Sequence, residues 1–205
     1  MSSNRIKQQS PVTDIVKKTD FQSHAVLFPD NMLEGLIPGA SVAHNGCCLT
    51  VTKVDGNTIW FDLMHATLNL TNLGLLVVGD KINLERAAKF GDEIGGHAMS
   101  GHIMCVARVV DVIDSENNRQ VWIEAPEKIA KYLFDKGYVG IDGISLTIGE
   151  VRNNRFCVNL IPETLQRTNM GWREVGDEVN IEVDPQTQAV VDTVERVLAA
   201  KNTTL

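Results

Sequence analysis

The chain lacks an apolar run long enough to cross a membrane, since its longest leucine–valine stretch, residues 73–78, is broken by glycine. Positive charge is also scarce: 19 Lys and Arg face 26 Asp and Glu, giving a net charge of −7. That balance argues against a nucleic-acid partner, because phosphate contacts need a basic surface. Residues 1–7 have no apolar core and do not read as a signal peptide. We expect a cytoplasmic protein that binds neither membranes nor nucleic acid.

Cysteine is sparse as well. Cys47 and Cys48 are adjacent, while Cys105 and Cys157 stand alone, and no pair has the spacing of a disulfide framework or a zinc site. A reducing compartment is the simplest interpretation, and no metal is predicted. The hydrophobic content of 43% is ordinary for a globular protein. The length allows one large domain or two smaller ones.

What the sequence does contain is an internal repeat. Val42–Val51 aligns with Val139–Ile148, 97 residues later, and the match continues without a gap as far as Glu85 and Glu182. This period is too long for a solenoid, whose repeats have about 20 to 45 residues. It indicates two similar domains in tandem, joined near residues 95–100.

Each half is rich in short alternating segments that are typical of strands. Asp55–Gly56 and Asn153–Asn154 mark hairpin turns between such segments. One short amphipathic helix is predicted over residues 126–136. Strands at this spacing with little helix favour a small closed barrel in each half. The predicted strands are residues 49–54, 58–63 and 81–85, and then 146–151, 155–160 and 178–183.

The C-terminal segment, residues 185–201, differs from the rest because valines and a leucine recur at helical spacing and the first half has no counterpart. This helix could pack on its own barrel. A β-branched seam outside two closed barrels, however, favours packing on copies of itself. We therefore predict an all-β chain with a C-terminal α-helix, divided into residues 1–97, 98–185 and 186–205.

The adjacent cysteines, Cys47 and Cys48, follow a glycine at the start of a predicted strand. Neighbouring residues of a strand point to opposite faces, so at most one of them lines a given pocket. The second half has Ile144 and Ser145 at these positions, which makes the outer position polar in both halves. We expect Cys47 to be a core residue and Cys48 and Ser145 to be the functional candidates.

Two histidines stand among small residues where the halves join. Their spacing matches no zinc pattern, so a metal site is not predicted there. His97 is interpreted as an ordinary surface histidine. His102 is predicted to open a strand over residues 103–112, at a barrel mouth, where an imidazole suits proton transfer.

In both halves a strand ends in a turn, over residues 62–68 and residues 159–165. Such a bend exposes backbone N–H and C=O groups that can pair with the amide-like edge of a heterocycle. Thr67 and Thr164 could bind a polyol, and capping of the local turn is an equally good interpretation.

These stretches resemble the riboflavin synthase family over nearly the whole chain, from about Val16 to Leu198. The resemblance implies a tandem pair of six-stranded Greek-key β-barrels with a C-terminal helix that joins three subunits, in agreement with the organisation predicted above. It rests on residues 44–51, 95–102, 140–147 and 184–188.

The resemblance implies an enzyme that dismutates two molecules of 6,7-dimethyl-8-ribityllumazine. One molecule gives up a four-carbon unit and is left as 5-amino-6-ribitylamino-pyrimidinedione, and the other becomes riboflavin. Each barrel would hold one lumazine, with the first barrel of one subunit facing the second barrel of a neighbour in a homotrimer. No metal or organic cofactor is implied, because the acidic C7 methyl group of lumazine provides the carbanion.

The same resemblance implies the site residues. His102 would shuttle protons, and Cys48 would be either a nucleophile or a polar wall that activates water. Asp142, Ser145 and Thr147 would orient the ribityl chain or relay protons. The first-barrel site would further contain Leu49, Thr50, Asp62, Leu63, Met64, His65, Ala66 and Thr67. The second-barrel site would contain His102 with Gly101, Ile103, Lys136, Leu146, Ile161, Pro162, Glu163, Thr164, Leu165 and Gln166.

Two features depart from the family pattern. The family opens with Met-Phe-Thr-Gly-Ile-Val, which forms the first strand and touches substrate, whereas residues 1–10 here are mostly polar. The internal repeat indicates the same departure, because residues 99–106 have the pattern of a strand and the equivalent residues 2–9 do not. We predict that the first four or five residues do not pair as a regular strand, or pair poorly, and that the first-barrel site is open on that side. Loss of this strand would also expose an edge of the first barrel. The second departure is Ala66, which stands where the other half has Glu163.

A second function fits the same fold. The lumazine proteins of luminous bacteria hold a lumazine or flavin as a fluorophore without turnover. A non-catalytic protein would be expected to lose the surroundings of Cys48 and His102, and this chain keeps both. The enzyme is therefore the prediction, and a lumazine- or flavin-binding protein is the alternative.

Overall fold

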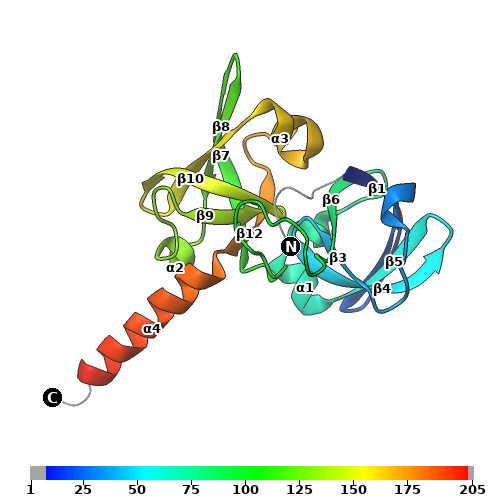
Figure 1. The fold of residues 1–205 in the computed structure, drawn as a ribbon, viewed down its shortest axis with the longest axis horizontal. Coiled ribbons are helices and arrows are strands. Elements are labelled where there is room, and N and C mark those ends of the chain that lie inside the picture. The colour runs from blue at the N-terminus through cyan, green and yellow to red at the C-terminus, as the bar shows by residue number, and fades with distance from the viewer. Residues whose placement is uncertain (1–7, 203–205) are drawn as a thin grey trace.

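A computed structural model describes residues 8–202. Two closed six-stranded antiparallel barrels lie side by side, and a long C-terminal helix projects from the second barrel (Figure 1). The predicted tandem of barrels with a C-terminal α-helix is confirmed. Within the described residues, no helix combines the length and the apolar character needed to span a membrane.

The first barrel closes in the order β1–β2–β5–β4–β3–β6, in which β2 and β3, and likewise β5 and β6, are separated as in a Greek key. Backbone pairing around the whole circle leaves this sheet without a free edge. Its strands are β1 (Gln8–Lys18), β2 (Phe21–Leu27), β3 (Ser41–His44), β4 (Cys47–Asp55), β5 (Thr58–Met64) and β6 (Lys81–Arg86). Its short helices are η2 (Asp30–Met32), α1 (His65–Leu70) and η3 (Asn72–Leu75).

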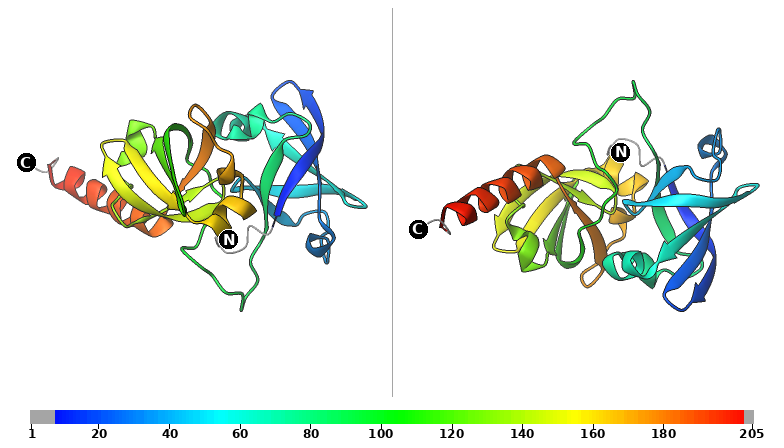
Figure 2. Two further views of the ribbon diagram at one scale, coloured as in Figure 1. Left: turned by 90° about the horizontal axis from the view of Figure 1, so that it is seen from above. Right: turned by 90° about the horizontal axis from the view of Figure 1, so that it is seen from below.

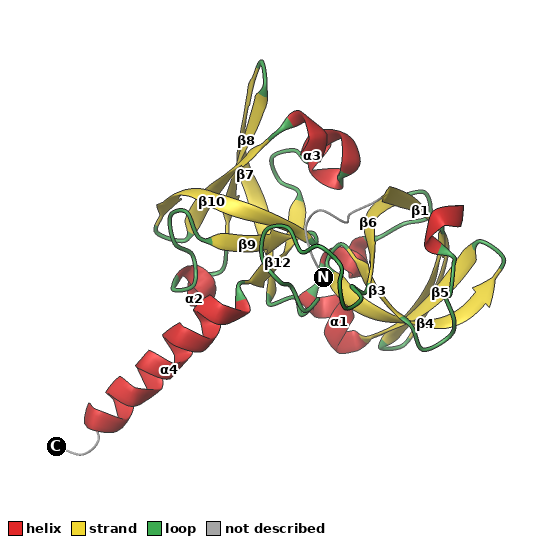
Figure 3. Cartoon of the chain, in the orientation of Figure 1, coloured by secondary structure: helices red, strands yellow, loops and turns green. Residues whose placement is uncertain are grey.

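The second barrel closes in the order β10–β11–β8–β7–β12–β9. Its strands lie between the first barrel and α4 (Figure 3). Each of its strands begins 97 residues after its counterpart, so the repeat also covers the first two strands of each half. These strands are β7 (Cys105–Ser115), β8 (Asn118–Glu124), β9 (Tyr138–Ile141), β10 (Ile144–Arg152), β11 (Arg155–Leu160) and β12 (Glu178–Val183). Its short helices are α2 (Glu127–Ala130), α3 (Pro162–Arg167) and η4 (Asn169–Gly171).

The first strand corrects the prediction that the first barrel has an exposed edge. Residues 8–11 of β1 pair with β6, and residues 12–18 pair with β2, so the circle is complete. Ser10 and Val12 are buried on the inner side. A largely polar segment closes the barrel because the ladder is made by backbone groups that every non-proline residue carries. Residues 1–7, which include the segment predicted not to pair, lie outside the described residues.

Each barrel encloses an apolar core, and the first core also contains two histidines. His24 and His44 are fully buried, with Nε2 of His24 2.9 Å from Nδ1 of His44 and both rings against Phe61. Burial lowers the pKa of His24 to about 4, and it lowers the pKa of His44 well below its usual value. Because of these lowered pKa values, both histidines are neutral near pH 7. The second barrel has Val121 and Ile141 at the equivalent positions.

The helix predicted over residues 126–136 is correct only in part. Helix α2 ends at Ala130, after which the amide of Tyr132 donates to the carbonyl of Ile129 in a tight turn. Tyr132 is then buried in the second core. Lys136 adopts a φ of +64°, which a helix cannot contain.

The predicted C-terminal helix is confirmed as α4 (Pro185–Asn202). In its first half, Val191 packs against the second core, and Asp192 accepts a hydrogen bond from the hydroxyl of Tyr132 at 2.5 Å. Lys131 pairs with Asp192 and Glu195, and beyond these contacts the helix extends away from the barrel (Figure 2). Val194 and Val197 are exposed. The helix is thus docked at one end and has an uncovered apolar side at the other.

The two barrels meet through a polar interface centred on two glycines. A Cβ placed on Gly46 would lie 2.6 Å from the backbone nitrogen of Gly143. Buried side chains around them form hydrogen bonds between the barrels, so the interface follows the approximate twofold symmetry of the repeat. The equivalent pairs are Asn45 and Asp142, Asn72 and Asn169, and Asn83 and Asn180.

Candidate functional site

Two of the predicted first-barrel residues, Cys48 and Thr50, lie on the outer face of β4. Cys47 is buried in the core, whereas Cys48 is half-buried and Thr50 is exposed on the other face. The prediction that Cys47 is a core residue is confirmed. Burial, followed by the nearby Cys48 and Glu182, raises the pKa of the Cys47 thiol to about 12, so this thiol stays protonated.

The second barrel repeats this arrangement. Ser145 is half-buried and Thr147 is exposed on the outer face of β10. Three other predicted site residues instead have their side chains in the barrel cores, so only their backbone can face a ligand on the outer surface. These residues are Leu49, Leu63 and Leu146.

The linker between β6 and β7 crosses from one barrel to the other and partly loops away from the body (Figure 2). The carbonyl of Gly101 accepts a hydrogen bond of 2.9 Å from the amide of Cys48, and Ile103 is buried in the first core. The exposed His102 lies between them. The structure thus corrects the assignment of these three residues to the second barrel. Because the side chain of Ile103 packs in the first barrel, β7 of the second barrel begins only at Cys105.

His97 was wrongly interpreted as a surface residue. It is buried, its ring stacks on Tyr138 with centroids 5.3 Å apart, and its Nδ1 lies 2.6 Å from Oγ of Ser145. Its backbone N–H also donates to that oxygen, at 3.1 Å. Burial lowers the pKa of His97, while Asp184 acts in the opposite direction. The second barrel therefore pairs its candidate hydroxyl with a neutral imidazole.

A cavity of about 460 Å³ opens beside this pair. Its walls come from the linker, the start of β9 and the first residues of α4, so the C-terminal helix helps to shape the surroundings of His97. The lining residues are Gly96, His97, Ala98, Tyr138, Asp184, Pro185 and Gln186.

The two strand-end turns take equivalent places after β5 and β11. Asp62 accepts a hydrogen bond of 2.7 Å from the hydroxyl of Ser23, and Met64 and Ile161 are exposed. Lys136 is also exposed, at the edge of the second barrel. Leu165 packs against the second core. The other predicted residues of the turns are exposed or half-buried in α1 and α3, and can contact a ligand on the surface: His65, Ala66, Thr67, Pro162, Glu163, Thr164 and Gln166.

Asp142 lies apart from both outer faces. It is fully buried between the barrels, and its carboxylate accepts hydrogen bonds from the side chains of Arg173, Asn72 and Asn169 at 2.7 to 2.9 Å. The amide of Asn180 donates to it as well, at 2.8 Å. This placement favours a role in joining the barrels over the direct contact with substrate that the resemblance implies.

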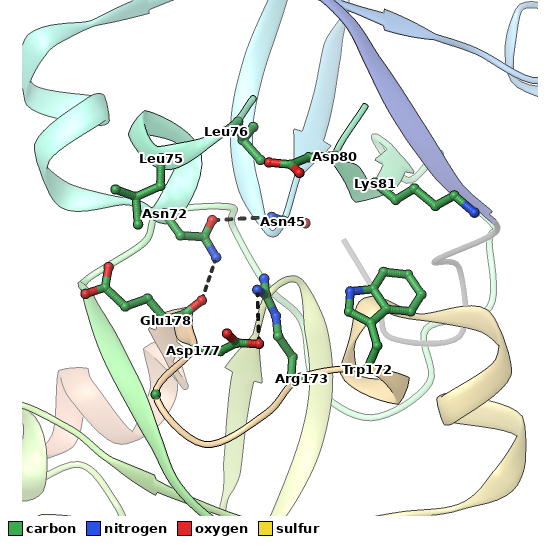
Figure 4. A pocket seen from close by; sticks show the side chains of 11 residues that line it. Asn45, Asn72, Leu75, Leu76, Asp80, Lys81, Trp172, Arg173, Asp177 and Glu178 are labelled. Atoms are coloured by element: carbon green, nitrogen blue, oxygen red, sulfur yellow. Dashed lines mark hydrogen bonds and ion pairs between the residues drawn. The ribbon is translucent and has the colours of Figure 1, made fainter. Parts of the chain in front are cut away.

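A second cavity, of about 440 Å³, is lined by Arg173, the residue that donates to Asp142 (Figure 4). Figure 4 shows Asp80 and Lys81 of the first barrel on one side and Trp172 and Arg173 on the other. The repeat places Leu75 opposite Trp172 in sequence and Asp80 opposite Asp177, so the cavity follows the approximate twofold axis. Sequence patterns gave no sign of it, because a cleft between domains leaves no local periodicity.

No group of three or more His, Cys, Asp and Glu side chains is arranged to hold a metal ion among residues 8–202. Both halves of the chain match the family model of the lumazine binding domain, over residues 4–87 and 100–184. The chain belongs to the lumazine-binding family.

The lumazine-binding family contains proteins with different names that are similar to this chain. The riboflavin synthase of Escherichia coli (strain K12) is 60% identical over 96% of this chain and 92% of its own length. The blue fluorescence protein of Aliivibrio fischeri is 48% identical over 80% of each chain. The crystal structure of LumP complexed with riboflavin has a TM-score of 0.82 and 33% identity, covering 89% of this chain and 99% of that one. The tandem barrels of this chain are thus shared by that solved structure.

Proposed function

We propose that this chain is an enzyme, a riboflavin synthase that transfers a four-carbon unit between two molecules of 6,7-dimethyl-8-ribityllumazine. The products are riboflavin and 5-amino-6-ribitylamino-pyrimidinedione. The observation that carries the proposal is the 60% identity with a riboflavin synthase over 96% of the chain. Two similar barrels suit a reaction that consumes two identical molecules.

The protein would accelerate the reaction chiefly by holding the two substrate molecules in the right positions. Two lumazines held face to face react as one bound pair, and such pre-orientation lowers a barrier by about 7 to 11 kcal/mol in favourable cases. The substrate supplies its own carbanion at the C7 methyl group, so the protein has to hold the rings, move protons and limit access of water. No cofactor is needed for this chemistry.

Each barrel offers one imidazole near its candidate polar group. In the first barrel, His102 follows Gly101, which lies against Cys48. In the second, His97 is hydrogen-bonded to Ser145. Thr50 and Asp62 on one barrel, and Thr147 and the α3 turn on the other, would bind the ring edge and the ribityl chain. His102 would move protons, and Cys48 would act as a nucleophile or a polar wall.

We also propose that the enzyme is a cytoplasmic homotrimer. Facing barrels from different subunits would bring the two lumazines together, and α4 would hold the subunits. Its exposed Val190, Val194 and Val197 support this, because apolar side chains on a helix that extends from its own barrel favour association.

The alternative is a fluorophore-binding protein. It is supported by the 48% identity with the blue fluorescence protein of Aliivibrio fischeri. The greater identity and coverage with the riboflavin synthase favour the enzyme.

Purified protein incubated with 6,7-dimethyl-8-ribityllumazine tests the proposal. We expect riboflavin absorbance to appear with one molecule of pyrimidinedione for each riboflavin formed. Tight binding of lumazine without product would support the fluorophore-binding alternative, and absence of both would exclude either function.

A further inference from the structure

A buried carboxylate of the second barrel holds the linker at the turn that reaches the first barrel. Glu182 lies in β12 and is only 4% exposed. Its carboxylate accepts hydrogen bonds from the amide of Ser100 at 2.6 Å, from the Ser100 hydroxyl at 2.9 Å and from the amide of Gly101 at 3.1 Å. A buried carboxylate is costly unless it is hydrogen-bonded, and these three donors supply charge-assisted bonds.

The same turn lies directly on Cys48. A Cβ added to Gly101 would stand 2.6 Å from Cβ of Cys48, and Gly101 has a φ of +80°. Only glycine combines that backbone conformation with so close an approach. The carbonyl of Gly101 accepts the hydrogen bond of the Cys48 amide, while its own amide is held by Glu182. One peptide segment therefore connects a carboxylate of one barrel with the candidate residue of the other.

The position of His102 follows from this connection. Its amide lies 3.3 Å from Oγ of Ser100, and the next residue, Ile103, is fixed in the first core. His102 is thus held between a turn tied to the second barrel and a side chain packed in the first. Release of the Ser100–Gly101 turn would free His102 at one end and uncover Cys48.

We propose that Glu182 is a positioning residue for the first-barrel site, and that it acts by fixing the Ser100–Gly101 turn against Cys48 and beside His102. The proposal rests on the proposed function for the catalytic meaning of Cys48 and His102. The second barrel thereby contributes to the site of the first within one chain, since Glu182 comes from the second barrel and Cys48 from the first.

The test compares Glu182→Ala and Glu182→Gln with the matched control Glu150→Ala. Glu150 lies on β10 of the same barrel and loses only an exposed ion pair with Arg152. Alkylation of each cysteine by iodoacetamide, followed by mass spectrometry, reports local opening of the turn. Riboflavin formation gives kcat and KM, and urea unfolding gives the overall stability.

In Glu182→Ala we expect Cys48 to be alkylated about tenfold faster, with Cys105 and Cys157 unchanged, because only the local segment opens. We expect kcat to fall by about tenfold or more with little change in KM, since a small misplacement of a reacting group is enough for that. Glu182→Gln keeps one acceptor oxygen and should fall between Glu182→Ala and the control.

The proposal is wrong if Cys48 alkylation in Glu182→Ala equals that of the control. It is equally wrong if all cysteines become reactive together, because Glu182 would then support the fold as a whole. Should the unaltered protein form no riboflavin, the proposed function fails, while the alkylation rates still decide whether Glu182 fixes the turn.

Discussion

Gly46 and Gly143 lie back to back where the barrels join, and each occupies the space that a side chain on the other would need. A Cβ on Gly143 would be 2.8 Å from the backbone nitrogen of Gly46, and both residues have φ values near +80°. Each of these two positions therefore requires glycine, because glycine has no Cβ and adopts positive φ values without strain.

Gly46→Ala should lower the free energy of unfolding by about 2 to 5 kcal/mol. Left-handed strain costs about 1 to 2 kcal/mol, and overpacking of a close contact adds about 1 to 3 kcal/mol. Gly56→Ala is the matched control, because Gly56 has a φ of +58° with open space around its Cβ position and should show the strain alone. Urea unfolding measures both variants. Equal losses would mean that the contact with Gly143 contributes nothing.

Cys48→Ala and His102→Gln should each lower kcat for riboflavin formation far more than they weaken lumazine binding. Such a pattern marks contacts made mainly in the transition state. Cys47→Ser serves as the comparison, because it places a hydroxyl in the first core and should lower stability more than turnover. Fluorescence titration and steady-state kinetics separate the effects. Full turnover in either of the first two variants would deprive that residue of its role.

The buried histidine pair predicts acid sensitivity of the first barrel. The folded pKa of His24 is about 4, below the usual value of 6.5, so the unfolded chain binds more protons between these values. Stability is therefore full above pH 6.5 and falls as the pH drops towards 4. At pH 5 His24 alone should cost about 2 kcal/mol. Urea midpoints at pH 7 and pH 5 measure this loss.

The second barrel supplies the control for that experiment. The double variant His24→Val with His44→Ile copies Val121 and Ile141 and should lose most of the difference between the two pH values. An unchanged difference would assign the acid sensitivity to other groups.

Removal of α4 should dissociate the proposed trimer. A chain ending at Asp184 should show about one third of the molar mass in light scattering, because the exposed valines are lost. Val194→Asp should have the same effect, whereas Arg196→Asp, on the opposite side of the helix, should leave the assembly intact. A trimer that persists without α4 would place the subunit contact elsewhere.

Replacement of residues 2–6 by Phe-Thr-Gly-Ile-Val should raise both turnover and thermal stability. These positions lie outside the described residues, and the expectation rests on the polar opening of this sequence compared with the family pattern. Each kcal/mol gained should raise Tm by about 2 to 4 °C. A replacement of equal length with serine and asparagine is the control, and an equal gain from both would contradict the role of an apolar opening.

Features repeated in the sequence were predictable, and features created by the path of the chain were not. Turn and core positions such as Gly46 and Gly143 recur after 97 residues, which gave the two barrels. Strand β1 was underestimated because Gln8 is polar and pairs with β6 through its backbone. His97 and Ser145 are 48 residues apart, and their hydrogen bond depends on the route of the linker.

The interface role of Asp142 is marked in the sequence by the repeat. This aspartate is equivalent to Asn45 in the repeat, and Asn72 and Asn83 are repeated as Asn169 and Asn180. Asparagines retained in both copies of a duplicated domain suit a twofold interface, in which each amide can donate and accept across the axis. Their recurrence predicts a contact between the halves better than it predicts a catalytic group.

The linker places the boundary between the two folded barrels at a different residue from the boundary between the two copies of the repeat. Ile103 belongs to the second copy of the repeat, yet it fills the core of the first barrel. A first barrel cut from the gene after residue 97 would lack the Ile103 side chain and have a hole in its core. The shortest fragment that keeps the first core whole therefore ends after Ile103, inside the second copy of the repeat.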